Sequence, residues 1–583
     1  MTASSRFQLI SLLLVCTLFF FSTAQDKTDF YKKGEKELKS GEWAKAGDTW
    51  IKGRNFLALE GKSDPRIGFA FIELVTEHEL THFYKQASRM YLEVLTENNL
   101  KKHPKLFQEE AKRLLPLVEE YNSRTVIKEW ENLIKKKSPE LIANMRGLWI
   151  NLDFTPVTEY NERLIEHWER IAYSRKNFTK SKRSAYKTDD RADIFIKYGK
   201  PDRERTGSHY IETRRKDGRV YRDIITYDIW AYTEMDAFDS IIYVFGANRG
   251  EPYEMKDSIE DFVPDLVSDA PFYDIYEKLM LFDPFFERRF NELAAGSGQA
   301  KTSYQMLDRD DALKYNIPIQ TSEYEEVSIN PISIISTLTR TLDENNDPKL
   351  CITAISYPRN IEEKYSLTHS LMIYDEMSDL EQKLTHTPSG SYDNISVFNF
   401  EHSEKKFRYV LASDAFEADA NSLETNNIGK VILEPEQPLV TDILKLELSD
   451  IITGADIPEN TDRDIFPFPI LPSVSTTSGD PFKVYFEIYH LRMNSDAKYR
   501  YEIEYSILRK KKPGFLHDLL GHNRNREMVS RSSEYSSNQP TVKESVYFDI
   551  SDLEIENYEF TITVTDLNSG QKKSRTGEFR IIN

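Results

Sequence analysis

Cysteine is almost absent from this chain, which carries only Cys16 and Cys351 in 583 residues. Cys16 lies in an apolar run near the N-terminus, so a single thiol remains if that run is removed as a leader. We therefore expect no intramolecular disulfide, and packed apolar cores must supply the stability. Cys351 lies in the apolar stretch 350–355, which favours a buried structural thiol over a nucleophile.

Motifs of the common enzyme and nucleotide-binding classes are also missing. The sequence has no phosphate-binding loop, no Gly-x-Gly-x-x-Gly, no Gly-x-Ser-x-Gly and no Cys-x-x-Cys. These absences lower the expectation of an enzyme without excluding one, and we expect no cofactor.

The balance of charge is strongly acidic, with a formal net charge of −19. Such a surface repels phosphate backbones, so we expect no general nucleic-acid binding. Two basic clusters, residues 203–222 and 509–512, are interpreted as solvated loop or strand-end charge.

Only one apolar run is long enough to bear on cellular location. Residues 9–21 are apolar, follow Arg6, and precede the small-residue pattern Ser22-Thr23-Ala24. This pattern predicts a signal peptide over residues 1–24 and export to the periplasm or cell surface. A run of about 13 residues is short of the roughly 20 that a membrane span needs. An uncleaved anchor and lipidation at Cys16 are the alternatives, and we expect no membrane segment after cleavage.

The remaining chain is too long for one core, so we predict a multidomain α+β protein. Helical spacing over residues 25–145 favours short helical hairpins that resemble tetratricopeptide repeats, with a generic helical bundle as the alternative. Gly34, Ala46 and Ala87 would let the paired helices approach closely. We expect this helical domain to bind another envelope protein.

Residues 146–300 predict a central α+β domain. A helix capped by Thr158 would bury Leu164, Trp168, Ile171 and Ala172 on its inner face. Its polar side would carry Glu162, Arg163, Glu166 and Arg170. A strand is expected at residues 192–198, then a tight turn at residues 199–202. Alternating patterns at residues 224–232 and 240–246 predict two strands of one antiparallel sheet.

Strand patterns dominate the rest of the chain and predict two β-sandwich domains, over residues 317–440 and 441–583. The second would begin with a strand at residues 443–448. In the strand at residues 482–489, Val484, Phe486 and Ile488 would face the core, with Tyr485 and Glu487 outside. Residues 509–541 are expected to form a polar insertion, without regular strands.

The densest charge cluster lies in residues 184–202, which we call the signature. Thr188-Asp189 is followed by Asp190, Arg191 and Asp193, and the turn Tyr-Gly-x-Pro-Asp closes the segment at residue 202. This segment resembles the signature of the GWxTD-domain family of exported bacterial proteins, which has no established activity. The family's Gly-Trp is here Ala185-Tyr186, and a Trp that often follows in the family matches Trp230. Because alanine stands here in place of that glycine, the turn at position 185 must leave room for a Cβ atom.

Two interpretations of the signature remain open. The carboxylates with Arg191 could form a polar pocket that binds a ligand or acts in acid–base catalysis. Alternatively, Thr188 and Asp189 accept backbone N–H groups while Arg191 pairs with a carboxylate and joins helix to sheet. The candidate binding residues form one set: Tyr186, Thr188, Asp189, Asp190, Arg191 and Asp193, with Glu162 and Arg163 of the preceding helix pairing with Arg191 and Asp189.

Histidine spacing gives little support for a metal site. His517 and His522 are five residues apart, and His78 and His82 are four apart but lack the His-Glu-x-x-His pattern. We therefore predict no metal. The sequence favours an exported, non-enzymatic binding or scaffold protein; the alternative is an envelope hydrolase of peptide or polysaccharide that uses the acidic cluster.

Overall fold

The computed structural model describes most of the chain, with gaps. Described are residues 28–118, 124–214, 216, 218–233, 240–248, 250–262, 272–294, 321–322, 329–357, 365–388, 394–402, 407–417, 426–434, 437–454, 475–477, 482–509, 527–548 and 553–582. They fall into two compact units: unit 1 comprises residues up to 145 together with 160–322, and unit 2 comprises residues 146–159 together with those from 323 onward. The expected boundary at residue 146 therefore does not separate the helical region from the central region. The expected leader lies outside the described residues.

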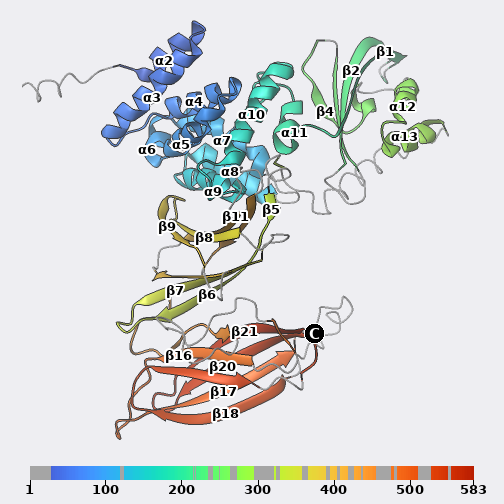
Figure 1. Ribbon diagram of the computed structural model, residues 1–583. Helices are drawn as coiled ribbons and strands as arrows, with labels where there is room; N and C mark the ends of the chain where they lie inside the picture. Colours follow the sequence, from blue (N-terminus) through green and yellow to red (C-terminus); the bar gives the residue numbers. More distant parts are fainter. Residues whose placement is uncertain are drawn as a thin grey trace, which may run out of the picture. The chain divides into compact units, whose positions relative to one another are not determined.

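Unit 1 begins with two helical pairs, α2 with α3 and α4 with α5 (Figure 1). Its helices up to α10 are α2 (Phe30–Lys39), α3 (Trp43–Leu59), α4 (Pro65–Glu77), η1 (Thr81–Phe83), α5 (Tyr84–Glu93), α6 (Glu97–Lys102), α7 (Pro104–Val118), α8 (Arg124–Lys136), α9 (Glu140–Leu152, which continues into unit 2) and α10 (Glu162–Asn177). Glycine permits the close approach expected in the first pair: a Cβ on Gly34 would lie 2.2 Å from Trp50 Nε1. No described helix is long and apolar enough to cross a bilayer.

Helix α10 differs from expectation at its start and on its charged side. Asn161, and not Thr158, caps it, because the Asn161 side chain accepts the backbone N–H of Leu164 at 2.8 Å. Leu164, Trp168 and Ile171 are buried as predicted, but so are three members of the charged side: Arg163, Glu166 and Arg170. Ala172, which was expected to be buried, is half-buried, and the solvent-facing side of α10 passes instead through Tyr173 and Lys176, which are exposed.

The central region contains one antiparallel sheet of order β1-β2-β3-β4. Its strands are β1 (Arg203–Arg214), β2 (Val220–Tyr232), β3 (Ile241–Asn248) and β4 (Glu254–Lys256). The expected pairing of residues 224–232 with 240–246 is confirmed in the β2–β3 ladder. The expected strand at residues 192–198 is wrong, because these residues form helix α11 (Arg191–Tyr198). Its short apolar run fits either element, and Ala192, Phe195 and Ile196 share a buried helical face.

Both faces of this sheet are covered. On one face α11 packs through Phe195 against Trp230 of β2 and Phe245 of β3. On the other, Ile225 and Ile229 pack against η2 (Ile259–Phe262), α12 (Tyr273–Leu279) and α13 (Pro284–Ala294), which lie beside β1 and β2 in Figure 1. The alternation along β2 therefore serves two cores, one above and one below the strand.

Unit 2 contains two pairs of stacked sheets. In the first pair, the sheet β5-β12-β11-β8-β9 shares a core with the sheet β10-β7-β6. The strands are β5 (Ile329–Pro331), β6 (Ser333–Leu342), β7 (Pro348–Tyr357), β8 (Tyr365–Tyr374), β9 (Leu380–His386), β10 (Ile395–Glu401), β11 (Arg408–Glu417) and β12 (Asn426–Leu433). Residues 146–159 also belong here: Lys430 donates to the backbone carbonyls of Ile150 and Asn151.

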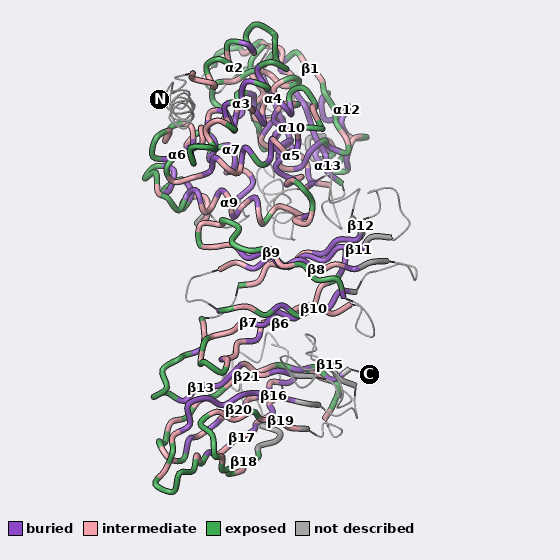
Figure 2. The backbone as a smooth tube through the Cα atoms, turned by 60° about the vertical axis from the view of Figure 1, so that its left-hand side comes forward, coloured by how far each residue is buried: buried purple, intermediate pink, exposed green. Residues whose placement is uncertain are grey.

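The second pair joins the sheet β13-β16-β14, with β19 beside β16, to the sheet β15-β21-β20-β17-β18. The strands are β13 (Glu447–Leu448), β14 (Ile452–Gly454), β15 (Ser475–Thr477), β16 (Phe482–Tyr489), β17 (Tyr499–Arg509), β18 (Glu527–Ser537), β19 (Val542–Phe548), β20 (Asn557–Asp566) and β21 (Lys572–Ile582). In Figure 2 buried stretches lie along strands such as β16, and exposed stretches lie in turns between strands.

Three expectations for this second pair are corrected. Residues 443–446 form a turn in place of a strand, with Ile443 and Leu444 exposed. Part of the expected insertion is a regular strand, β18. Val484 faces the core as predicted, but Tyr485 and Glu487, which were expected outside, are also buried. The hydroxyls of Tyr485 and Tyr489 donate to the Glu487 carboxylate at 2.5 and 2.9 Å, which satisfies it in its buried position.

Candidate functional site

The signature carboxylate Asp189 lies in a buried ion-pair cluster. Arg191 holds it through two parallel hydrogen bonds, Nε to Oδ1 at 3.0 Å and Nη2 to Oδ2 at 2.9 Å. The same guanidinium reaches Asp228 of β2 at 3.0 Å, and Trp230 Nε1 donates to the other oxygen of Asp228. The exposed fractions of the side chains are 0% for Asp189, 1% for Asp228 and 11% for Arg191.

Two aromatic rings enclose the Arg191 guanidinium. It lies 4.7 Å from the ring centre of Phe178 and 4.2 Å from that of Tyr253, which is the geometry of cation–π contacts. Burial alone would lower the pKa of Arg191, but the bonds to Asp189 and Asp228 outweigh it, and this pKa is raised. Burial raises the pKa of Asp228 to about 6, although its hydrogen bond from Arg191 acts in the opposite direction.

Asp189 also organises the backbone of the signature turn. Its carboxylate accepts the backbone N–H of Thr179 at 3.0 Å and that of Arg191 at 3.3 Å. Neighbouring Thr188 is buried and forms a bridge with Lys180. Asp189 therefore carries both the turn and the ion pair, as the packing interpretation expects, but the Thr188 hydroxyl, which was expected to accept a backbone N–H, has no hydrogen-bond partner among the described residues.

Tyr186 is a buried anchor and does not line an opening. Its hydroxyl donates to the backbone carbonyl of Arg113 in α7 at 2.5 Å, and burial raises its pKa well above the ordinary range. Ala185 lies in a turn closed by a hydrogen bond from the backbone N–H of Lys187 to the carbonyl of Ser184. The positive φ of 66° belongs to Lys187, so Ala185 is accommodated without strain.

The remaining acids of the signature have local partners. Asp190 accepts the backbone N–H of Met255 at 3.0 Å, and its own N–H donates to the carbonyl of Tyr253, which attaches β4 to the signature. Asp193 lies in the first turn of α11, where a carboxylate interacts favourably with the helix dipole.

Arg163 of α10 contacts the C-terminal end of α11 and does not form the expected pair with Asp189. It donates to the carbonyl of Ile196 at 3.2 Å and lies 3.8 Å from Glu166, which pairs more closely with Arg170. Burial lowers the pKa of Arg163 to about 9. Glu162 occupies the first turn of α10 beside it. Because α11 spans about 12 Å, the predicted residues form two clusters instead of one site.

Sequence reasoning missed three members of the Asp189 cluster: Asp228, Phe178 and Tyr253. Asp228 lies inside an alternating strand pattern, where a charged residue is expected to face solvent. Its one signal is the neighbouring Trp230, which the family resemblance had singled out. Phe178 and Tyr253 were indistinguishable from other core aromatics.

The histidine and cysteine side chains of the described residues lie apart from the Asp189 cluster. No three potential ligands converge among the described residues to hold a metal, and His517 and His522 lie outside them. Burial raises the pKa of the Cys351 thiol to about 12. His369 is buried between two serine hydroxyls, Ser356 at 2.7 Å and Ser396 at 2.6 Å, and burial lowers its pKa to about 4.

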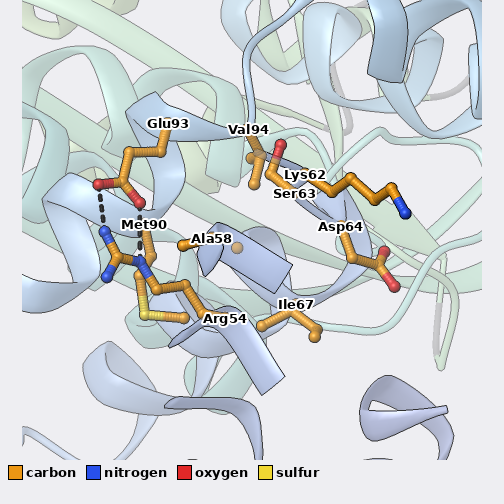
Figure 3. Close-up of a pocket in the computed structure, with 10 residues that line it drawn as sticks. Arg54, Ala58, Lys62, Ser63, Asp64, Ile67, Met90, Glu93 and Val94 are labelled. Atoms are coloured by element: carbon orange, nitrogen blue, oxygen red, sulfur yellow. Dashed lines mark hydrogen bonds and ion pairs between the residues drawn. The ribbon is translucent and has the colours of Figure 1, made fainter. Parts of the chain in front are cut away.

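Two adjoining hollows on the first helices are open to solvent; together we call them the α3–α4 groove. The larger holds about 350 Å³ and the smaller about 30 Å³, and Lys62, Asp64 and Ile67 line both. The larger is lined by Thr28, Asp29, Phe30, Phe56, Leu57, Glu60, Lys62, Asp64, Arg66 and Ile67. The smaller is lined by Arg54, Ala58, Lys62, Ser63, Asp64, Ile67, Gly68, Met90, Glu93 and Val94 (Figure 3).

The groove combines an apolar floor with a charged rim. In the smaller hollow Arg54 makes two hydrogen bonds to Glu93, at 2.9 and 2.5 Å, drawn as dashed lines in Figure 3. In the larger, Arg66 pairs with Asp64 at 2.6 Å and with Asp29 at 3.4 Å. These pairs hold the rim in a fixed shape. The larger volume is at the lower end of the range for ligand pockets.

Comparison with known proteins gives no family. No protein-family model matches the chain, and no curated protein matches it. Among solved structures, the native conformation of Escherichia coli alpha-2-macroglobulin aligns with 66% of this chain and 22% of its own, at 9% identity and a TM-score of 0.17. The chicken CNTN1 FN1–FN3 domains align with 44% of this chain and 68% of their own, at 12% identity and a TM-score of 0.15. This chain thus spans about a fifth of the macroglobulin, and similarities at these TM-scores carry no argument about its function.

Proposed function

We propose that this is an exported binding or scaffold protein of the bacterial cell envelope, which binds a partner protein through the α3–α4 groove. The first helical pairs would act as tetratricopeptide-like hairpins, and the central region as a GWxTD-like domain that holds them in place. The stacked sheets of unit 2 would serve as assembly modules.

One contrast supports this proposal most strongly. Of the acids that the hydrolase alternative would use, Asp189 is enclosed and bound by Arg191, together with Asp228, at exposed fractions of 0% and 1%. The half-buried Asp190 accepts the backbone N–H of Met255. The groove, by comparison, offers open apolar surface next to fixed charges. An extended peptide could place an apolar side chain in the larger hollow and polar backbone along the rim. Nothing in the Asp189 cluster favours the hydrolase alternative.

Deleting the helices would be a poor test of this proposal. Trp168 of α10 packs edge-on against Tyr91 of α5, at 6.4 Å between ring centres, and lies under the Arg113 guanidinium of α7. Removing residues 25–145 would expose this core, so any loss of binding could reflect misfolding.

Point variants on α3 avoid that problem. Leu57→Glu places a charge in the larger hollow, whereas Leu59→Glu makes the same change two residues away, at a position that is 89% exposed and lines neither hollow. Affinity capture from envelope extract should recover the same partner with the unmodified chain and with Leu59→Glu, and lose it with Leu57→Glu. Equal capture by both variants would refute binding at the groove.

A further inference from the structure

Strand β18 is a long edge strand at one end of its five-stranded sheet. The order β15-β21-β20-β17-β18 places it last, and no other described strand pairs with its outer edge (Figure 1). It has 11 residues, whereas the end strands β4, β5 and β15 have three each. An edge strand of this length presents a row of backbone N–H and C=O groups that can pair with another strand.

Strand β18 carries few of the devices that usually protect such an edge: its one register shift against β17 lies near its start, between Val529 and Glu527, and residues 531–537 pair regularly. Residues 531–537 read Arg-Ser-Ser-Glu-Tyr-Ser-Ser, without proline or lysine and with one charge of each sign. The long edge strand β1 differs, because five of its 12 residues are charged. The edge strand β9 carries Lys383 and a register shift against β8. The composition of β18 therefore leaves pairing with a further strand unopposed.

The side chains of β18 are arranged for pairing with a copy of themselves. Arg531, Ser533 and Tyr535 lie opposite Tyr505, Ile503 and Tyr501 of β17, so these three share the core-facing side. In an antiparallel pair, opposing residues lie on the same side of the sheet. A two-fold axis between two identical strands must then pass through a residue paired with its own copy.

We propose that two copies of this chain associate through β18, antiparallel, about a two-fold axis at Ser533. An axis at Arg531 or Glu534 would place like charges opposite each other. An axis at Ser533 places Arg531 opposite Tyr535 of the second copy, twice, which allows two cation–π contacts. Tyr535 is accessible for this contact, since it is 38% exposed. Its ring is held by stacking on Tyr501, with 5.5 Å between ring centres.

The association would extend one sheet across both copies and remove the exposed edge. A two-fold axis makes the interface identical for both partners, so the assembly closes as a dimer and does not grow into a fibre. Glu534 would lie beside Ser532 of the second copy, and its existing contact with Arg500 at 3.2 Å, on the opposite side from Arg531, would remain.

Cysteine cross-linking tests both the dimer and its axis. In the full chain carrying Cys16→Ser, the remaining Cys351 is only 2% exposed, so an engineered surface thiol is the one that reacts. Ser533→Cys would place two thiols on the axis, with Cα atoms about 4.5–5.5 Å apart and within disulfide reach. Ser537→Cys is the matched control on the same strand and side; its two copies would lie about 27 Å apart.

Light scattering of the Cys16→Ser chain should give the dimer mass, and mild oxidation should produce a disulfide dimer of Ser533→Cys but not of Ser537→Cys. A monomer mass at all accessible concentrations would overturn the proposal. So would equal cross-linking of the two variants, which indicates random collision, or failure of Ser533→Cys to cross-link.

Discussion

Replacing Asp189 with alanine tests whether the signature is part of the packing of the fold. The Asp189 carboxylate accepts four hydrogen bonds, from the backbone of Thr179 and from the backbone, Nε and Nη2 of Arg191. Breaking a buried ion pair by removing one partner costs about 3–5 kcal/mol, since the other charge remains buried. Asp228 still holds Arg191, so we expect a loss near the lower end, about 3 kcal/mol.

Urea unfolding followed by tryptophan fluorescence measures this loss. Trp230 donates to Asp228 and lies in the adjoining core, so its emission reports on this cluster. Asp190→Ala is the matched control, because its partly exposed carboxylate accepts one backbone N–H; we expect a loss below about 1 kcal/mol. In the double variant Asp189→Ala with Arg191→Met, both partners of the Asp189–Arg191 pair are gone, while Asp228 loses its partner just as in Arg191→Met alone, so the loss should be smaller than the sum of the single losses.

The reasoning is refuted if Asp189→Ala unfolds within 1 kcal/mol of the unmodified chain. If that stable variant also lost an envelope-hydrolase activity that the unmodified chain possesses, the hydrolase alternative would replace the scaffold proposal.

Three further predictions concern packing, protonation and thiol access. Gly34→Ala should lower the free energy of unfolding by about 1–3 kcal/mol in urea titration, because the added Cβ meets the Trp50 indole; an unchanged value would mean that the two helices separate freely. The folded-state pKa of His369, about 4, lies below its unfolded value of 6.5, so stability present above pH 6.5 is lost as pH falls towards 4, by about 3 kcal/mol. Asp414, with its pKa raised to about 6 by burial, acts in the opposite direction, so denaturant titrations of His369→Gln and the unmodified chain must be compared; parallel pH profiles would contradict the account. Cys351 should react with a thiol reagent at least tenfold faster in urea than in the native state, and equal rates would show that its strand is accessible.

Regular alternation and large aromatic residues made the sheets predictable from the sequence. The strands β2 and β3 and the inward face of β16 follow from alternation that the adjoining cores dictate, as at Val484 and Phe486 of β16. Glu487 was misplaced because its burial depends on the hydroxyls of Tyr485 and Tyr489, which flank it in the sequence but whose hydrogen bonds only the folded strand reveals.

The helix α11 and the charged side of α10 show what local patterns cannot supply. The eight residues of α11 fit a strand or a helix equally, and the deciding contact is made by Trp230, which is distant in the sequence. Arg163 and Arg170 were assigned to the polar side of this helix, yet both are buried and donate to the carbonyl of Ile196 at the end of α11. The candidate site was therefore split by contacts that no spacing rule encodes.

The α3–α4 groove was the least predictable feature. Its floor and rim come from four helices, α2 to α5, and the pairing of Arg54 with Glu93 joins residues 39 positions apart. Sequence reasoning assigned partner binding to the helical region as a whole, but could not indicate which surface of it is open.

The most direct test of the binding proposal compares capture of an envelope partner by Leu57→Glu and Leu59→Glu, with equal folding of both verified by circular dichroism. The account predicts that Leu59→Glu retains the partner at the level of the unmodified chain and that Leu57→Glu loses at least nine-tenths of it, a tenfold change that corresponds to about 1.4 kcal/mol. Retention of the partner by Leu57→Glu would contradict the account and move the binding surface away from the groove.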